Sequence, residues 1–277
     1  MNDESKPTSN PASNPASDVP NSTDDDMAHA DIGFVAALNI EIDPFLRRCL
    51  TPKKYTGGEF TFRGGRYDDA RVALVESGPG FARARRATQA LVQAHTPRYI
   101  VSCGFSGALQ PELELGHIVM ADAICDTHGQ NISLTLNLPE QLPAGVHAGR
   151  LVVVDEPVTT SQDKHDLGQT HQALAVDTGS LAVAQVCRDL GVGFLAVRVI
   201  TDPLDTDLHP EAQSVLAATT GRRIGATLGS LWKRPGSYKE LWQLREQARF
   251  AAQQLAGFLD GVVEQLYDAI SEAASDD

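Results

Sequence analysis

The chain has 277 residues and a formal net charge of −13. No basic stripe interrupts this negative balance, which argues against a nucleic-acid partner. No run of eighteen apolar residues occurs, so the sequence predicts no membrane-spanning helix. The cysteines lie far apart and form no metal or redox pair, which indicates reduced thiols and a cytoplasmic protein: Cys49, Cys103, Cys125 and Cys187.

Residues 1–30 differ in composition from the rest of the chain. They are rich in Asn, Ser, Pro, Asp and Thr, and they carry about five of the thirteen excess negative charges. Such a segment cannot bury enough apolar surface to offset its ordering entropy. We therefore expect a disordered acidic tail over residues 1–30, followed by a single domain over 31–277.

Strand and helix patterns alternate after the tail. In chain order they predict a strand at 32–37, a helix at 41–50, strands at 60–63 and 71–76, a helix at 81–95, and strands at 99–103, 117–125 and 151–156. They continue with a strand at 173–177, a helix at 181–190, a strand at 193–201, and helices at 210–231 and 239–269. The polar stretch 126–148 could be a surface insertion or lid. This alternation is typical of an α/β sheet covered on both faces.

Four blocks in this order carry a family resemblance. They are residues 32–37 with Glu41, 72–80, 102–109 with 115–119, and 194–202. Together they resemble 5′-methylthioadenosine/S-adenosylhomocysteine nucleosidases and the wider nucleoside phosphorylase superfamily over about 31 to 210. The resemblance implies a three-layer αβα sandwich with a central mixed sheet and a homodimer. It also implies cleavage of the N-glycosidic bond of a purine nucleoside, in particular a 5′-substituted adenosine, with no cofactor but with phosphate as a possible co-substrate.

The resemblance assigns catalysis to Glu41 and Asp202. A purine that leaves a ribose needs a proton, and burial of Asp202 just past an apolar strand would favour the protonated form of a general acid. Glu41 could activate water from the other side, as in glycoside hydrolysis by two carboxylates. From the residues alone, Glu41 could equally be a charge at a helix N-terminus, and Asp202 part of a turn-forming Asp-Pro pair.

The resemblance also implies a set of substrate-binding residues. Backbone amides of the loops around Gly78 and Gly104 would face the ribose or the nucleophile, although neither loop is specific by itself. Arg198, inside an apolar strand, is either a site residue or half of a buried structural ion pair. The predicted set is Gly78, Gly104, Phe105, Ser106, Asp177, Thr178 and Arg198. The histidines show no ligand spacing, so no metal is expected.

The sequence departs from the family after residues 175–176. The family usually has an acid, a Met and a Glu there, and the Glu grips the ribose hydroxyls, whereas this chain has Asp177, Thr178 and Gly179. A lost charged hydrogen bond costs about 1.5–3 kcal/mol. Asp177 or a water could take over, the sugar could differ, or the enzyme could be weak. Phosphorylase members also carry an Arg in place of Ser102 and a Ser in place of Phe105, which favours water over phosphate as the nucleophile.

A narrower resemblance involves residues 164–167, 222–225 and 231–236. These segments resemble hopanoid-associated phosphorylases, which are thought to act on adenosylhopane. Apolar and basic side chains also gather around a Pro-Gly joint: Leu228, Leu231, Trp232, Lys233, Arg234, Tyr238, Lys239, Leu241, Trp242, Leu244 and Arg245. They could pack on the core or at a dimer contact, or line the entrance for the 5′ substituent and contact anionic membranes weakly.

Two other functions compete with the nucleosidase interpretation. Residues 177–180 spell the aspartic protease signature, but that enzyme needs two such aspartates and no second copy occurs. With Gly179 in place of the ribose carboxylate, the domain could also be a nucleoside-binding module without turnover.

Overall fold

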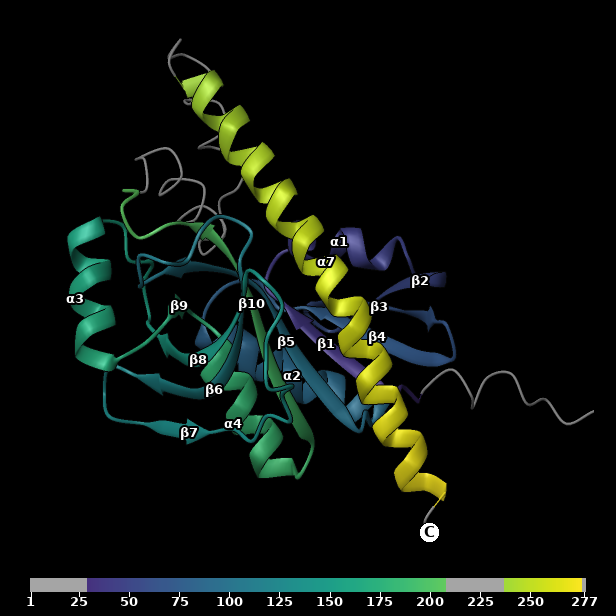
Figure 1. Ribbon diagram of the computed structural model, residues 1–277. Coiled ribbons are helices and arrows are strands. Elements are labelled where there is room, and N and C mark those ends of the chain that lie inside the picture. Colours follow the sequence, from purple (N-terminus) through teal and green to yellow (C-terminus); the bar gives the residue numbers. More distant parts are fainter. Residues whose placement is uncertain (1–28, 208–236, 276–277) are drawn as a thin grey trace, which may run out of the picture.

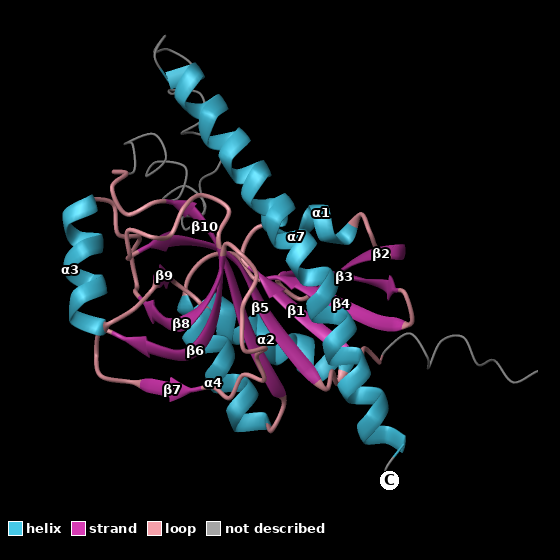
Figure 2. Ribbon diagram, viewed as in Figure 1, coloured by secondary structure: helices cyan, strands magenta, loops and turns pink. Residues whose placement is uncertain are grey.

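The computed structural model describes residues 29–207 and 237–275, with the side chains of the last helix described from Arg245 onward. The strands are β1 Ile32–Ala36, β2 Leu50–Gly57, β3 Phe60–Tyr67, β4 Ala70–Glu76, β5 Tyr99–Ala108, β6 Ile118–Asp126, β7 Asn131–Ser133, β8 Val146–Val153, β9 Ala175–Asp177 and β10 Gly193–Asp202. The helices are α1 Asn39–Leu46, α2 Phe81–His95, α3 Ser161–His171, α4 Ser180–Leu190 and α7 Ser237–Ser275. Figure 2 shows the helices around a central sheet, and none of the described helices is long and apolar enough to cross a membrane.

The sheet is mixed and partly closed. Its order is β10-β6-β8-β9-β5-β1-β4-β3-β2, and β10 also pairs with β5, so five strands form a ring. β1 runs parallel to β4 and β5, and β10 runs parallel to β5, whereas β6 and β9 pair with β10 and β5 in the antiparallel sense. The carboxyl ends of β1, β5 and β10 therefore meet at one edge of the sheet, where ligands bind in open α/β sheets.

Both faces of the sheet are covered. Successive strand residues point to opposite faces, and in β1 Phe34 packs with residues of α1 and α7, whereas Val35 packs with residues of α2 and α4. The predicted three-layer αβα sandwich with a central mixed sheet is thus confirmed (Figure 1). All four cysteines are buried, and burial raises the pKa of Cys103 and of Cys187 to about 12, which makes both thiols inert.

Three predicted elements were wrong in detail. The first helix ends at Leu46, and Leu50 begins β2, an edge strand whose mostly exposed side chains give no apolar pattern. The loop predicted at residues 104–107 lies inside β5, because β10 and β9 pair with this stretch. Residues 126–148 are not one irregular insertion, because β7 pairs with β6 and β8 already begins at Val146.

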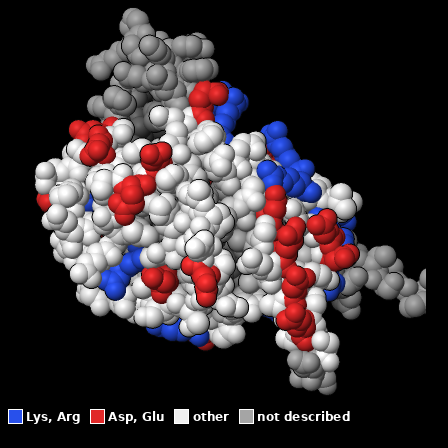
Figure 3. Space-filling view, in the orientation of Figure 1, with Lys and Arg blue, Asp and Glu red and all other residues white. Residues whose placement is uncertain are grey.

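One helix was missed, and one predicted helix lies where the structure is not described. α3 was not predicted, because its polar sequence has no apolar stripe; Thr160 caps it by accepting the N–H of Asp163. The helix predicted at 210–231 lies outside the described residues. α7 matches the predicted last helix. Acidic side chains run along the helix in Figure 3. In the sequence of α7, Asp260, Glu264, Asp268 and Glu272 follow one another at helical spacing.

The boundary of the predicted tail needs a correction. Of residues 1–30, only His29 and Ala30 are described, and both contact the domain. Ala30 is buried and its N–H donates to the carbonyl of His95 at 3.0 Å, while Nδ1 of His29 lies 2.8 Å from Oγ1 of Thr96. The packed domain therefore begins before residue 31.

Two truncations test this boundary. A chain that starts at residue 29 should unfold in urea at the same midpoint as the full chain, because the composition of residues 1–28 predicts no packing. A chain that starts at residue 31 loses the Ala30 hydrogen bond and its buried methyl, and it should lose about 1 kcal/mol of unfolding free energy. Equal stability of the two truncated chains would contradict the boundary.

Candidate active site

A cavity of about 630 Å³ opens at the edge of the sheet where the strands end. Its walls include all the predicted catalytic and substrate-binding residues: Glu41, Gly78, Gly104, Phe105, Ser106, Asp177, Thr178, Arg198 and Asp202. Residues far apart in the chain thus meet at one site. The volume lies within the range of pockets that hold small organic ligands.

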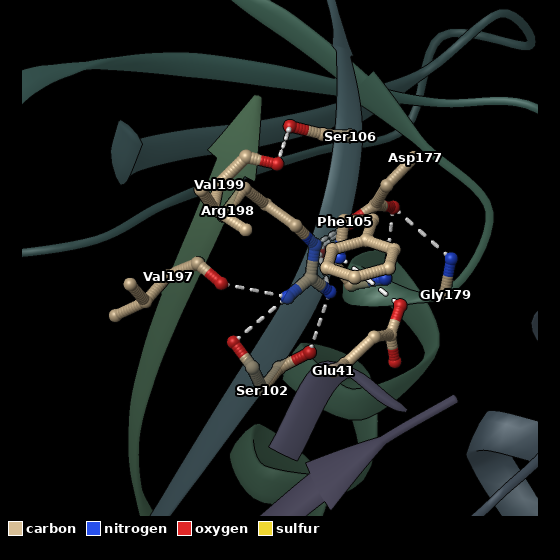
Figure 4. A network of polar contacts seen from close by, with 10 residues as sticks. Glu41, Ser102, Phe105, Ser106, Asp177, Gly179, Val197, Arg198 and Val199 are labelled. Atoms are coloured by element: carbon tan, nitrogen blue, oxygen red, sulfur yellow. Dashed lines mark hydrogen bonds and ion pairs between the residues drawn. The ribbon is translucent and has the colours of Figure 1, made fainter. Parts of the chain in front are cut away.

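Glu41 is held at the start of α1 by two backbone amides. The N–H of Leu38 donates to Oε2 at 2.8 Å. The N–H of Phe105 donates to Oε1 at 3.1 Å (Figure 4). An added Cβ on Gly104 would lie 2.9 Å from Oε1, so only glycine lets the carboxylate approach β5 this closely. Burial raises the pKa of Glu41, and these amides and the charge of Arg198 offset this only in part. A carboxylate with a raised pKa suits a general base.

Arg198 uses all of its donors on protein acceptors. Nε donates to Oδ2 of Asp177 at 2.5 Å. Nη1 donates to the carbonyls of Ser102 and Val197, both at 2.9 Å, and Nη2 donates to the hydroxyls of Ser102 and Ser180, both at 2.8 Å (Figure 4). A guanidinium has five N–H bonds, and all five are engaged. Of the two interpretations of Arg198, the contacts fit the buried structural ion pair.

Asp177 is the other half of this pair. Oδ1 accepts the N–H groups of Gly179 at 3.0 Å and Ser180 at 3.1 Å, and Oδ2 accepts Arg198 and the Ser180 hydroxyl. Burial alone would raise the pKa of Asp177, but Arg198 and these hydrogen bonds outweigh it and hold the pKa below its ordinary value. A carboxylate offers about four lone-pair sites, and all four are occupied. Asp177 is therefore poorly suited to replace the missing ribose carboxylate.

Space for that carboxylate exists at Gly179. An added Cβ there would meet only the Cβ of Ala84, at 3.4 Å, which is an ordinary contact. Gly179 lines the cavity beside Thr178 and precedes the first residue of α4. The backbone thus tolerates a side chain at this position.

Asp202, at the end of β10, sits in an ion pair. Its Oδ2 lies 2.9 Å from Nζ of Lys164, and the Thr201 hydroxyl donates to Oδ1 at 2.9 Å. An added Cβ on Gly107 would lie 2.8 Å from Oδ2, so this carboxylate also packs on a glycine of β5. Sequence reasoning expected desolvation here and did not foresee Lys164, which belongs to the polar helix α3 and gives no periodic signal.

The loops around Gly78 and Gly104 were expected to present backbone amides to the ligand, but two of these amides donate to protein acceptors instead. The N–H of Gly78 donates to the carbonyl of Ala37 at 3.0 Å, and the N–H of Phe105 is bound to Glu41. The Ser106 hydroxyl lies 3.5 Å from the carbonyl of Val199, within the sheet. These groups shape the wall of the cavity and have protein partners of their own.

A family profile described as the phosphorylase superfamily matches residues 31–142 and 133–230. The chain belongs to this superfamily. Among curated superfamily relatives, a 5′-methylthioadenosine/S-adenosylhomocysteine nucleosidase of Staphylococcus saprophyticus is 24% identical over 200 residues, which cover 64% of this chain and 88% of the relative. The corresponding nucleosidase of Maridesulfovibrio salexigens is 24% identical over 229 residues, which cover 72% and 99%.

Solved structures of the superfamily share the fold. The nucleosidase of S. pneumoniae with a transition-state inhibitor gives a TM-score of 0.61 at 19% identity, covering 83% of this chain and 99% of that one. Futalosine hydrolase of Helicobacter pylori gives 0.62 at 19% identity, covering 87% and 99%. For the narrower hopanoid resemblance, residues 164–167 lie in α3, and 222–225 and 231–236 lie outside the described residues. In the cluster around the Pro-Gly joint, only Arg245 has a described side chain, and it lines the cavity.

Removal of the Arg198 guanidinium tests the structural pair. Arg198→Met leaves Asp177 buried without its cation and should lower the unfolding free energy by about 3–5 kcal/mol. Arg86→Met breaks the exposed pair with Glu59 and should leave the unfolding free energy close to that of the wild type. Urea unfolding of both variants measures the difference, and similar losses would refute the structural role of Arg198.

Proposed function

We propose that the protein hydrolyses the N-glycosidic bond of a purine nucleoside, with a 5′-substituted adenosine as the substrate class. The observation that carries this proposal is the presence of two carboxylates, Glu41 and Asp202, on the wall of one cavity, in different electrostatic environments. Glu41 is desolvated and held by backbone amides, whereas Asp202 contacts a buried cation. Environments that separate two carboxyl groups in this way support one base and one acid.

The two groups pack on different glycines of the same strand. Glu41 meets Gly104 and Asp202 meets Gly107 in β5. In inverting glycosidases one carboxyl group likewise activates the attacking water and a second one protonates the leaving group. Glu41 takes a proton from water as it attacks the anomeric carbon, and Asp202 gives a proton to the departing purine.

The substrate class rests on the relatives and on the cavity. The curated relatives cited above are nucleosidases for 5′-methylthioadenosine and S-adenosylhomocysteine. Beyond the carboxylates, the cavity wall continues to Leu115 and to Arg245 and Ala248 of α7. We assign this part to the 5′ substituent, because a base and a ribose alone leave part of such a volume unfilled.

Water is the proposed nucleophile. A phosphate would need free cationic donors beside the ribose, and the five N–H groups of Arg198 already have protein acceptors. A phosphate requirement would instead favour a phosphorylase, which is what the hopanoid resemblance implies. Gly179 favours one second candidate, a nucleoside-binding module without turnover, since no side chain at this position grips the diol.

Substitution of the two acids tests the proposal. Asp202→Asn and Glu41→Gln should each lower kcat for 5′-methylthioadenosine by about 10²-fold or more. Because the base must be ionised, kcat/KM of the wild type should rise with pH through the raised pKa of Glu41, above the ordinary Glu value of about 4.3. Asp43→Asn removes another α1 carboxylate, paired with Arg47, and should leave turnover unchanged. Normal turnover in either acid variant would contradict the assignment.

Restoring the family's side chains tests the departure at Gly179. Gly179→Glu combined with Thr178→Met should tighten binding of ordinary purine nucleosides by roughly 10- to 100-fold, the equivalent of one charged hydrogen bond. Gly179→Ala with Thr178→Met supplies the matched control without the carboxylate. No gain over this control, in a variant that still folds, would show that the site holds the ribose in another way.

A further inference from the structure

Lys164 of α3 is a fully buried cation with three protein acceptors. Its side chain has 0% exposure, and Nζ lies 2.9 Å from Oδ2 of Asp202. The same nitrogen donates to the carbonyl of Pro203 at 3.1 Å and to that of Thr206 at 2.9 Å. An ammonium has three N–H bonds, so every proton of Lys164 is directed to Asp202 or to the loop that follows it.

Anchoring that loop does not by itself require a charge. The loop is tied to α3 by a second contact, in which the N–H of Ser161 donates to Oδ1 of Asp207 at 2.6 Å. A buried ion pair is often no more stabilising than an apolar pair of similar volume. What an apolar side chain could not provide is a proton and a positive charge beside Asp202.

A general acid must hold a proton when the substrate arrives. The Lys164 ammonium, 2.9 Å from Oδ2, is the N–H donor that this carboxyl group contacts. We propose that Lys164 is a positioning residue for the reaction proposed above, on which this inference rests: it holds Asp202 against Gly107 and supplies the proton that Asp202 passes to the leaving purine.

The step balances as follows in atoms and charge. The bond between the anomeric carbon and the purine nitrogen breaks, and its electron pair enters the purine ring. A ring nitrogen takes a proton from Asp202, which takes one from Lys164, and a neutral amine remains. The proton of the attacking water goes to Glu41, and solvent returns one proton from Glu41 to Lys164 after the products leave.

Other charged groups share the cavity and bear on its pH dependence. They are Glu41, Asp155, Asp177, Arg198, Asp207 and Arg245. Asp177 and Arg198 are paired with each other. Among the described residues, Lys164 is the cation in ion-pair contact with Asp202. The pair should therefore control the alkaline side of the pH profile.

The pH profiles of the wild type and of Lys164→Met, measured with 5′-methylthioadenosine, test the source of the proton. If Lys164 supplies it, Lys164→Met should lower kcat by about 10²-fold or more and move the alkaline limb of the profile to lower pH, because the group that carries the proton is gone. An alkaline limb at the same pH in both proteins would overturn the proposal.

A double-mutant cycle separates this role from simple support of the fold. If Lys164 acts through Asp202, Lys164→Met should change kcat less than about threefold in an Asp202→Asn background. Thr160→Ala removes the cap of α3 and serves as the control: it should lower the melting temperature and leave the pH profile in place. Additive losses in the cycle, or an alkaline limb that Lys164→Met does not move, would contradict the role of Lys164. Absence of turnover in the wild type would instead contradict the proposed function itself.

Discussion

The site depends on the close approach of two carboxylates to the backbone of one strand. Glu41 and Asp202 each come within van der Waals contact of a glycine of β5, at Gly104 and Gly107, where a Cβ would collide with a carboxylate oxygen. β5 can hold both groups because it pairs with β1 on one side and with β10 on the other. The mixed sheet therefore fixes where the two carboxylates lie, and the two glycines allow their close approach.

The charged groups of the cavity divide into three environments. Glu41 is desolvated and raised in pKa, Asp177 is saturated by Arg198 and its neighbours and lowered in pKa, and Asp202 is paired with Lys164. The three carboxyl groups of one cavity thus differ in the partners that each receives. In the proposed function Glu41 is the base and Asp202 passes the proton to the purine. The structural pair also explains why an arginine can sit inside an apolar strand, since all of its hydrogen bonds are made within the protein.

Helices and strands that carry their own apolar spacing could be predicted from the sequence. Buried strands such as β1 and the amphipathic helix α2 follow directly from apolar spacing. The site residues were assigned by the family resemblance, and the positions of Glu41 and Asp202 at or after strand ends were consistent with it. Contacts between segments far apart in the chain leave no such pattern in the sequence. Gly104 to Gly107 reads as a turn until β9 and β10 pair with it, and Lys164 reads as a solvated charge on a polar helix until the loop after β10 covers it. The engaged amide of Gly78 escaped for the same reason, because its acceptor, Ala37, lies in another segment.

The central claim is that this site hydrolyses the N-glycosidic bond of a purine nucleoside. The most direct measurement is release of free base from 5′-methylthioadenosine, S-adenosylhomocysteine, adenosine, inosine and a 5′-alkyl adenosine, each incubated with the purified protein with and without phosphate. The account predicts release of adenine from 5′-substituted adenosines at a rate that phosphate does not change. Release of base that requires phosphate would contradict water as the nucleophile. Binding of these nucleosides without release of any base would contradict the proposed enzymatic activity.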